Sequence, residues 1–149
     1  DRWPEHSSAF HAGWKKLRKD WVELDERLTA THAAYRDQPL LASHPVYQYL
    51  ERRYGWNLVS MHWEPDEMPE DGDWEDLQEI LQDHPAGWMI WEAEPLPEIR
   101  QRLAEMGIDS VVFDPCSNVP RSGDLLLTMH DNVKQLQRIM VAEPSSSAP

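Results

Sequence analysis

The sequence predicts an α/β protein: a four-stranded parallel sheet flanked by helices and preceded by one long backbone helix. Residues 1–38 carry one continuous amphipathic pattern, and the rest of the chain alternates short apolar runs with helical stretches. The apolar runs lack the polar alternation of half-exposed strands, which indicates strands covered on both faces. A chain that alternates strand and helix in this way typically forms a parallel sheet with right-handed crossovers.

Residues 8–36 are expected to form the long helix. Their large apolar side chains recur at alternating steps of four and three positions, as on one face of a helix. Such a helix would be about 40 Å long at ~1.5 Å per residue, and Pro39 follows its end. The apolar face suits either a coiled coil or a strut along a larger body, and the change of pattern after Pro39 favours the strut. The residues on this face are Phe10, Trp14, Leu17, Trp21, Leu24, Leu28 and Tyr35.

Four apolar runs after Pro39 predict strands, and the stretches between them predict helices. Gly55 and Gly107 stop two of these helices, and Asp124 is placed to cap the start of the last. The expected organisation is a linking helix over 1–38, an α/β lobe over 39–141 and a disordered polar tail over 142–149. The predicted strands are 40–43, 58–61, 88–91 and 110–113, and the helices are 46–54, 74–82, 96–106 and 124–140.

Composition narrows the classes of function. Fourteen Lys and Arg against 27 Asp and Glu give a net charge of −13, which repels phosphate, so we expect no nucleic-acid partner. A single cysteine, Cys116, excludes an intrachain disulfide. No segment approaches the roughly 20 apolar residues that span a bilayer. The sequence also contains none of the common hydrolase, P-loop or dinucleotide-binding motifs, so we expect no enzyme.

Candidate ligands follow the predicted strands, at the edge where open parallel sheets bind ligands. His44, Glu64, Glu92 and Asp114 come after the first, second, third and fourth strand. Each has an ordinary explanation, since His44 could cap the next helix and Asp114, before a proline, could end its strand in a turn. Clustered carboxylates, however, need a cation, an arginine or shared protons. A histidine with carboxylates is a ligand set for zinc, manganese or iron.

Other polar residues carry weaker signals. His11, His32 and His84 are expected on the solvated surface, and Cys116 is expected to be a buried, unreactive thiol rather than a soft ligand. The acidic segment 64–76, "EPDEMPEDGDWED", is interpreted as a solvated loop that leads into a helix, because carboxylates suit the first turn of a helix.

Four stretches resemble, in order, the second lobe of the periplasmic zinc/manganese-binding proteins that serve ABC importers, the cluster A-I (ZnuA-like) solute-binding proteins. The preceding helix resembles the backbone helix that joins the two lobes in that family. The stretches are "LLASHPVYQYLERRYGWN", "HWEPDEMPEDGDWEDLQEIL", "WMIWEAEPLPEIRQRLAEMGIDSVVFDP" and "SGDLLLTMHDNVKQL".

The resemblance implies a periplasmic or membrane-tethered protein that captures Zn²⁺ or Mn²⁺ and delivers it to an ABC permease. In that family two histidines of the first lobe and two residues of the second hold the metal, and the latter match His44 and Asp114. Glu92 matches a glutamate that supports the ligands without touching the metal. The first lobe is absent, so we expect this chain to be the C-terminal lobe and to bind metal weakly when alone.

Two rival hypotheses use the same residues differently. A stand-alone interaction module would keep the fold without transporting metal, and would self-associate through the apolar face of the long helix, with Phe10, Trp14 and Trp21 at its centre. A metal-dependent hydrolase would use the strand-end carboxylates, although no nucleophile or base pair is recognisable. Metal capture is the leading hypothesis.

Overall fold

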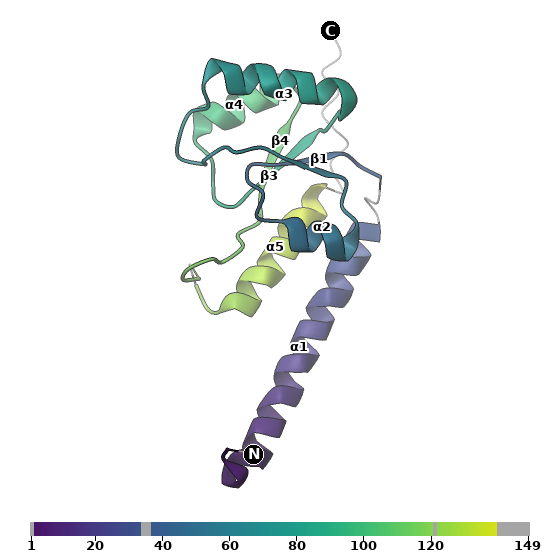
Figure 1. The fold of residues 1–149 in the computed structure, drawn as a ribbon, viewed down its shortest axis with the longest axis vertical. Helices are drawn as coiled ribbons and strands as arrows, with labels where there is room; N and C mark the ends of the chain where they lie inside the picture. Colours follow the sequence, from purple (N-terminus) through teal and green to yellow (C-terminus); the bar gives the residue numbers. More distant parts are fainter. Residues whose placement is uncertain (1, 34–36, 121, 140–149) are drawn as a thin grey trace.

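The structure is a computed structural model that describes residues 2–33, 37–120 and 122–139. After the first helix its elements alternate between strand and helix (Figure 1). The α/β class is confirmed, and every bound of the predicted strands lies within one residue of the observed one. The elements are the 3₁₀ helix η1 (Pro4–His6), α1 (Ser7–Ala33), β1 (Leu40–Ala42), α2 (Gln48–Tyr54), β2 (Leu58–Ser60), α3 (Asp71–Asp83), β3 (Trp88–Trp91), α4 (Pro97–Glu105), β4 (Asp109–Val112) and α5 (Leu125–Ile139).

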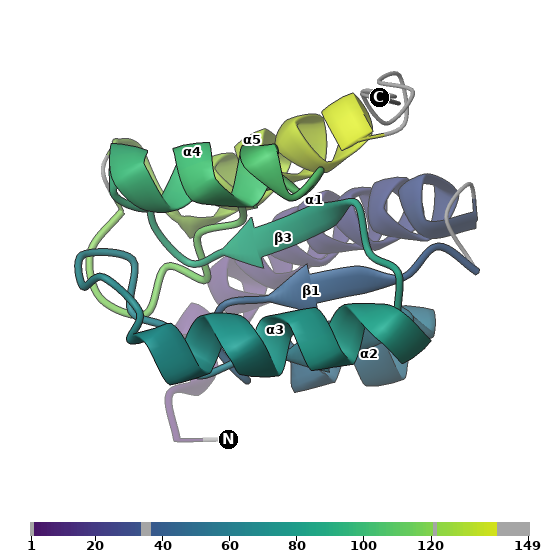
Figure 2. The same cartoon turned by 90° about the horizontal axis from the view of Figure 1, so that it is seen from above.

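The sheet is parallel throughout and has the strand order β2-β1-β3-β4. From β1 the chain moves to β2 on one side, then crosses back to β3 and β4 on the other. All strands point the same way, as Figure 2 shows for β1 and β3, so their carboxyl ends meet at one edge. The strand order reverses between β1 and β3, and in open α/β sheets this is where ligands bind.

Helices cover both faces of the sheet, which explains why the strands read as continuous apolar runs. Helices α3 and α4 lie on one side, and α2, α5 and the end of α1 lie on the other (Figure 1). Side chains of β1 alternate between two cores. Leu41 packs in the core that contains Trp74 of α3, whereas Leu40 and Ala42 pack in the core that contains Val133 of α5.

Only the last turns of α1 pack on the α/β body. Leu24 and Leu28 are 3% and 5% exposed, whereas Phe10 and Trp14 on the predicted apolar face are 59% and 57% exposed. Figure 1 shows the first half of the helix extending away from the sheet. The apolar face of α1 therefore extends beyond the part of the helix that the α/β body covers.

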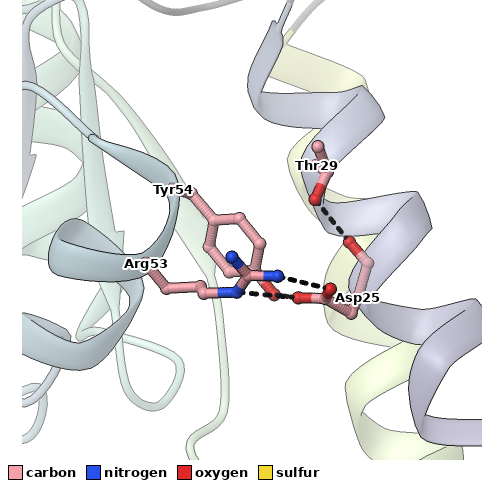
Figure 3. Close-up of polar contacts among 4 residues, drawn as sticks. All are labelled: Asp25, Thr29, Arg53 and Tyr54. Atoms are coloured by element: carbon pink, nitrogen blue, oxygen red, sulfur yellow. Dashed lines mark hydrogen bonds and ion pairs between the residues drawn. The ribbon is translucent and has the colours of Figure 1, made fainter.

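A charged joint fastens α1 to α2 (Figure 3). The Arg53 guanidinium donates to both carboxylate oxygens of Asp25, at 3.1 and 2.6 Å, and the Tyr54 hydroxyl donates to Asp25 at 2.9 Å. The hydrogen bonds from Arg53, and then that from Tyr54, lower the pKa of Asp25. Helix α2 begins four residues after His44, so this joint also holds the end of the loop that carries the histidine.

Some predicted bounds need correction. Helix α3 begins at Asp71, three residues before the predicted start, because Glu70 and Asp73 form a reciprocal capping box with each other's backbone. Half of the acidic segment is thus helical. The predicted end of the long helix, residues 34–36, and the tail 142–149 lie outside the described residues, and the division at residues 38 and 39 stays a prediction. No described helix is long and apolar enough to cross a membrane.

Candidate metal centre

The carboxyl ends of the strands carry all four predicted ligands, and backbone hydrogen bonds continue past the strands to hold them in place. Beyond β1, the N–H of Ser43 donates to the Ile90 carbonyl of β3 at 2.8 Å. The Ser43 carbonyl in turn accepts the N–H of Trp63, also at 2.8 Å. The segments that carry His44 and Glu64 are therefore extensions of neighbouring strands rather than free loops.

The His44 ring is held in one tautomer. Its Nδ1 lies 3.0 Å from the backbone carbonyl oxygen of Trp63, and a carbonyl can only accept, so Nδ1 carries the hydrogen. In the neutral imidazole Nε2 then has a free lone pair, and it lies 3.4 Å from Oε1 of Glu64. Histidines that bind metals typically donate their other ring nitrogen to a carbonyl or carboxylate in this way. His62 packs edge to face against the ring, with centroids 6.0 Å apart.

Asp114 is held by its backbone and by one carboxylate oxygen. The side-chain amide of Asn132, on α5, accepts the Asp114 N–H at 3.0 Å and donates to the Asp114 carbonyl at 2.6 Å. The N–H of Cys116 donates to Oδ1 of Asp114 at 2.7 Å, in a turn where Cys116 has a positive φ of 55°. The second carboxylate oxygen has no hydrogen bond from another described residue, so it is available to a ligand.

Tyr47 connects the histidine loop to the strand that carries Asp114. Its buried hydroxyl donates to the Phe113 carbonyl at 2.9 Å. Burial raises the pKa of Tyr47 above its ordinary value, and the negative charges of Glu92 and Asp114 raise it further. Both carboxylates thus act electrostatically on one phenol, which places them at the same end of the sheet.

The tightest group of possible ligands is His44, Glu64 and Glu92. One ligand atom from each residue lies within 4.8 Å of the other two. Among the described residues, no other group of three or more histidines, cysteines and carboxylates lies close enough to hold a metal ion. Asp114 is not a member of it. Sequence reasoning placed the four residues at one edge, and the structure shows that three of them meet directly.

Three supporting residues were missed by the sequence prediction. Asn132 lies on the buried face of α5, three positions from Met129 and four from Leu136. An asparagine on an apolar helix face indicates a polar partner inside the fold, so the sequence could have revealed this residue. No local pattern could reveal the Trp63 carbonyl or the Tyr47 hydroxyl as partners, since both contacts join distant segments.

The prediction for two of the other histidines was wrong. His32 is buried, and His84 binds the carbonyl oxygen of Leu40 through Nε2 at 2.9 Å. The spacing of apolar residues along the sequence could not reveal that these two side chains lie against other parts of the fold. The acidic segment, apart from Glu64, remains a solvated loop and a helix start, as predicted.

A cleft lined by Arg100 and Arg138 lies elsewhere, beside the free edge of β4 between α4 and α5. The strand-end group is shallow by comparison, since the side chains of His44 and Glu64 are 23% and 52% exposed. A buried metal site at this edge would need a cover that the described residues do not supply.

Comparisons with known proteins identify the family and the fold. The family described as "Zinc-uptake complex component A periplasmic" (ZnuA) matches residues 2–139. No curated protein sequence matches the chain. The zinc(II)-bound ZnuA-like domain of Streptococcus pneumoniae AdcA is similar in structure, with a TM-score of 0.80 and 17% identity over 94% of this chain and 55% of that one.

Two further solved structures share the fold. The metal-dependent lipoprotein YcdH from Bacillus subtilis has a TM-score of 0.80 and 17% identity, over 91% of this chain and 53% of that one. The laminin-binding protein Lbp of Streptococcus pyogenes has a TM-score of 0.69 and 18% identity, with the same coverage. This chain spans about half the length of these structures. Because the family match covers nearly all of the sequence, the chain belongs to the family of the periplasmic zinc-uptake complex component A.

Proposed function

We propose that this chain is the C-terminal lobe of a two-lobed protein that captures Zn²⁺ or Mn²⁺ and delivers it to the membrane permease of an ABC uptake system. It would work in the periplasm, or tethered to a membrane on its outer side. It would bind the ion without catalysing a reaction. His44 and Asp114 are the ligands that this lobe contributes, and the missing N-terminal lobe would supply the rest and cover the site.

The observation that carries this proposal is the orientation of the His44 ring. With Nδ1–H bound to the Trp63 carbonyl, Nε2 is directed to the strand-end carboxylates, where a metal ion would meet it. Asp114 supports it, because Cys116 occupies one carboxylate oxygen and leaves the other for a single bond to an ion. A nitrogen and an oxygen donor suit zinc and manganese and do not suit Cu(I), which prefers sulfur.

Zinc titration of the full two-lobed protein tests the proposal, with affinity measured by competition against a chromogenic chelator. We expect His44→Ala and Asp114→Asn each to weaken zinc binding by at least about tenfold, because the loss of a supporting residue alone often costs that much. His62→Ala is the matched control, since it removes a neighbouring imidazole that packs on the His44 ring. Unchanged affinity in His44→Ala would refute the assignment.

The exposed face of α1 favours a second candidate, a stand-alone interaction module with the same fold. Phe10, Trp14 and Leu17 are all at least half exposed along the first half of this helix. In a two-lobed protein the other lobe would cover this face, whereas in a stand-alone module a partner protein or a second copy would do so. The two cases differ in zinc affinity, which the module would lack.

A further inference from the structure

Three neighbouring strands bring His44, Glu64 and Glu92 together at the point where the strand order reverses. Glu64 follows β2, His44 follows β1 and Glu92 follows β3, and these three strands are adjacent in the sheet. One ligand atom from each residue lies within 4.8 Å of the others. All three donors come from this chain and none from a second lobe.

The spacing of the donors fits a divalent cation. With bonds of about 2.0–2.2 Å to nitrogen and oxygen, neighbouring ligand atoms of a tetrahedral ion lie roughly 3.3–3.6 Å apart. The distance between Nε2 of His44 and Oε1 of Glu64 is 3.4 Å, within this range. The Glu92 oxygen lies within 4.8 Å of the other two ligand atoms, so a rotation of its side chain can bring it to this spacing. The half-exposed Glu64 can also adjust its side chain freely.

The charges of the group also call for a cation. Within the part of the chain that the structure describes, no lysine or arginine forms an ion pair with Glu64 or Glu92. The nearby Arg100 pairs with Glu94 instead. Two carboxylates that converge without a lysine or arginine partner repel each other, and a bound cation relieves that repulsion.

We propose that His44, Glu64 and Glu92 form a divalent-cation site contained within this lobe, distinct from the closed site that His44 and Asp114 complete with another lobe. It rests on the proposed function, because both sites share His44. The exposed Glu64 receives the ion from solvent, and Glu92 holds it from the sheet side.

The donor set selects the class of ion. One imidazole nitrogen and two carboxylate oxygens suit Zn²⁺, Mn²⁺ and Fe²⁺, whereas a soft ion finds no sulfur in the group. The exposed rim keeps water available for the remaining coordination positions, which is typical of a site that exchanges its ion. The site is therefore expected to bind more weakly, and to release faster, than a closed site between two lobes.

Zinc titration of this 149-residue chain tests the site, with affinity measured by chelator competition and folding checked by circular dichroism. We expect Glu64→Gln and Glu92→Gln each to weaken zinc binding by at least about tenfold. Glu67→Gln is the matched control, since it removes the same charge from an exposed residue of the same acidic segment and should change affinity less than twofold. We expect Asp114→Asn to weaken binding by this chain less than either glutamate variant does.

The two proposals fail in different ways. If Glu64→Gln and Glu92→Gln bind zinc as tightly as the unchanged chain while His44→Ala and Asp114→Asn bind it more weakly, the lobe-contained site is wrong and the His44–Asp114 site stands. If Glu64→Gln and Glu67→Gln weaken binding equally, general attraction to negative charge explains the effect and the lobe-contained site is again wrong. If His44→Ala leaves the affinity unchanged, both proposals are wrong.

Discussion

The side chain of Asn132 holds both backbone polar groups of Asp114. Its Oδ1 accepts the Asp114 N–H at 3.0 Å, and its Nδ2 donates to the Asp114 carbonyl oxygen at 2.6 Å. Asn132 is itself 4% exposed, so the amide cannot exchange these partners for water. Asn132, on helix α5, thus binds the backbone of Asp114 as a neighbouring strand would within the sheet. Among the described residues, no strand pairs with Asp114 beyond the end of β4.

Asn132→Ala is expected to weaken zinc binding by the two-lobed protein by about tenfold, because Asp114 would lose the contacts that fix its position. It should also lower the free energy of unfolding by about 1–3 kcal/mol, since two partly buried backbone groups lose their partners. Zinc competition and urea unfolding measure the two effects. The control is Gln135→Ala on the next turn of α5. A stability loss with unchanged zinc affinity would show that the Asn132 contact serves the fold alone.

Tyr54→Phe tests the joint between α1 and α2. The variant keeps the ring and removes the hydroxyl that donates to Asp25 at 2.9 Å, so we expect unfolding to become easier by about 1 kcal/mol. Tyr49→Phe is a matched control on the same helix, because Tyr49 is 81% exposed. Urea unfolding followed by circular dichroism compares the two. Equal effects of the two substitutions would argue against the joint.

The same joint makes stability depend on pH on the acid side. Hydrogen bonds from Arg53 and Tyr54 hold the pKa of Asp25 below its ordinary value of 3.8, so at low pH the unfolded chain takes up this proton before the folded chain does. The stabilisation is present above the ordinary pKa and is lost as pH falls through the lowered one. The Asp25→Asn variant should lack this part of the acid dependence. The difference in unfolding free energy between the variant and the unchanged chain should therefore shrink as the pH falls.

Unfolding curves at a series of acidic pH values measure this dependence. Glu26→Gln is the control, because Glu26 neighbours Asp25 on α1 but is exposed. If Asp25→Asn and the unchanged chain differ by a constant amount at every pH, the lowered pKa of Asp25 does not contribute to acid unfolding.

The exposed face of α1 predicts self-association of this chain when it is alone. Large apolar side chains in a continuous exposed patch drive association, and Phe10, Trp14 and Leu17 are between 50% and 59% exposed on one helix face. Light scattering should give a mass above the 17.4 kDa of one chain, increasing with concentration. Trp14→Glu should reduce it, and the control Lys15→Glu should not. A single mass of 17.4 kDa at all concentrations would contradict the prediction.

Local pattern was sufficient for most of the fold. The central strands β1 and β3 were predictable because both of their faces are covered, which makes each of them a short apolar run that stands out from the amphipathic helices. The start of α3 was misplaced because its cap uses Glu70 and Asp73, which belong to an acidic segment that also suits a loop. Periodicity reports which face of an element is apolar, and it does not report which side chains cap its ends.

The sequence by itself determined that His44, Glu64, Glu92 and Asp114 would lie at one edge, because the direction of each strand follows from parallel pairing. Only the tertiary structure decided which of them meet. Strand order places β1 between β2 and β3, so His44 lies beside both glutamates. Asp114 follows the outer strand β4 and is held by Asn132 instead. Strand order and helix docking depend on contacts between segments far apart in the chain, and no local pattern records those contacts.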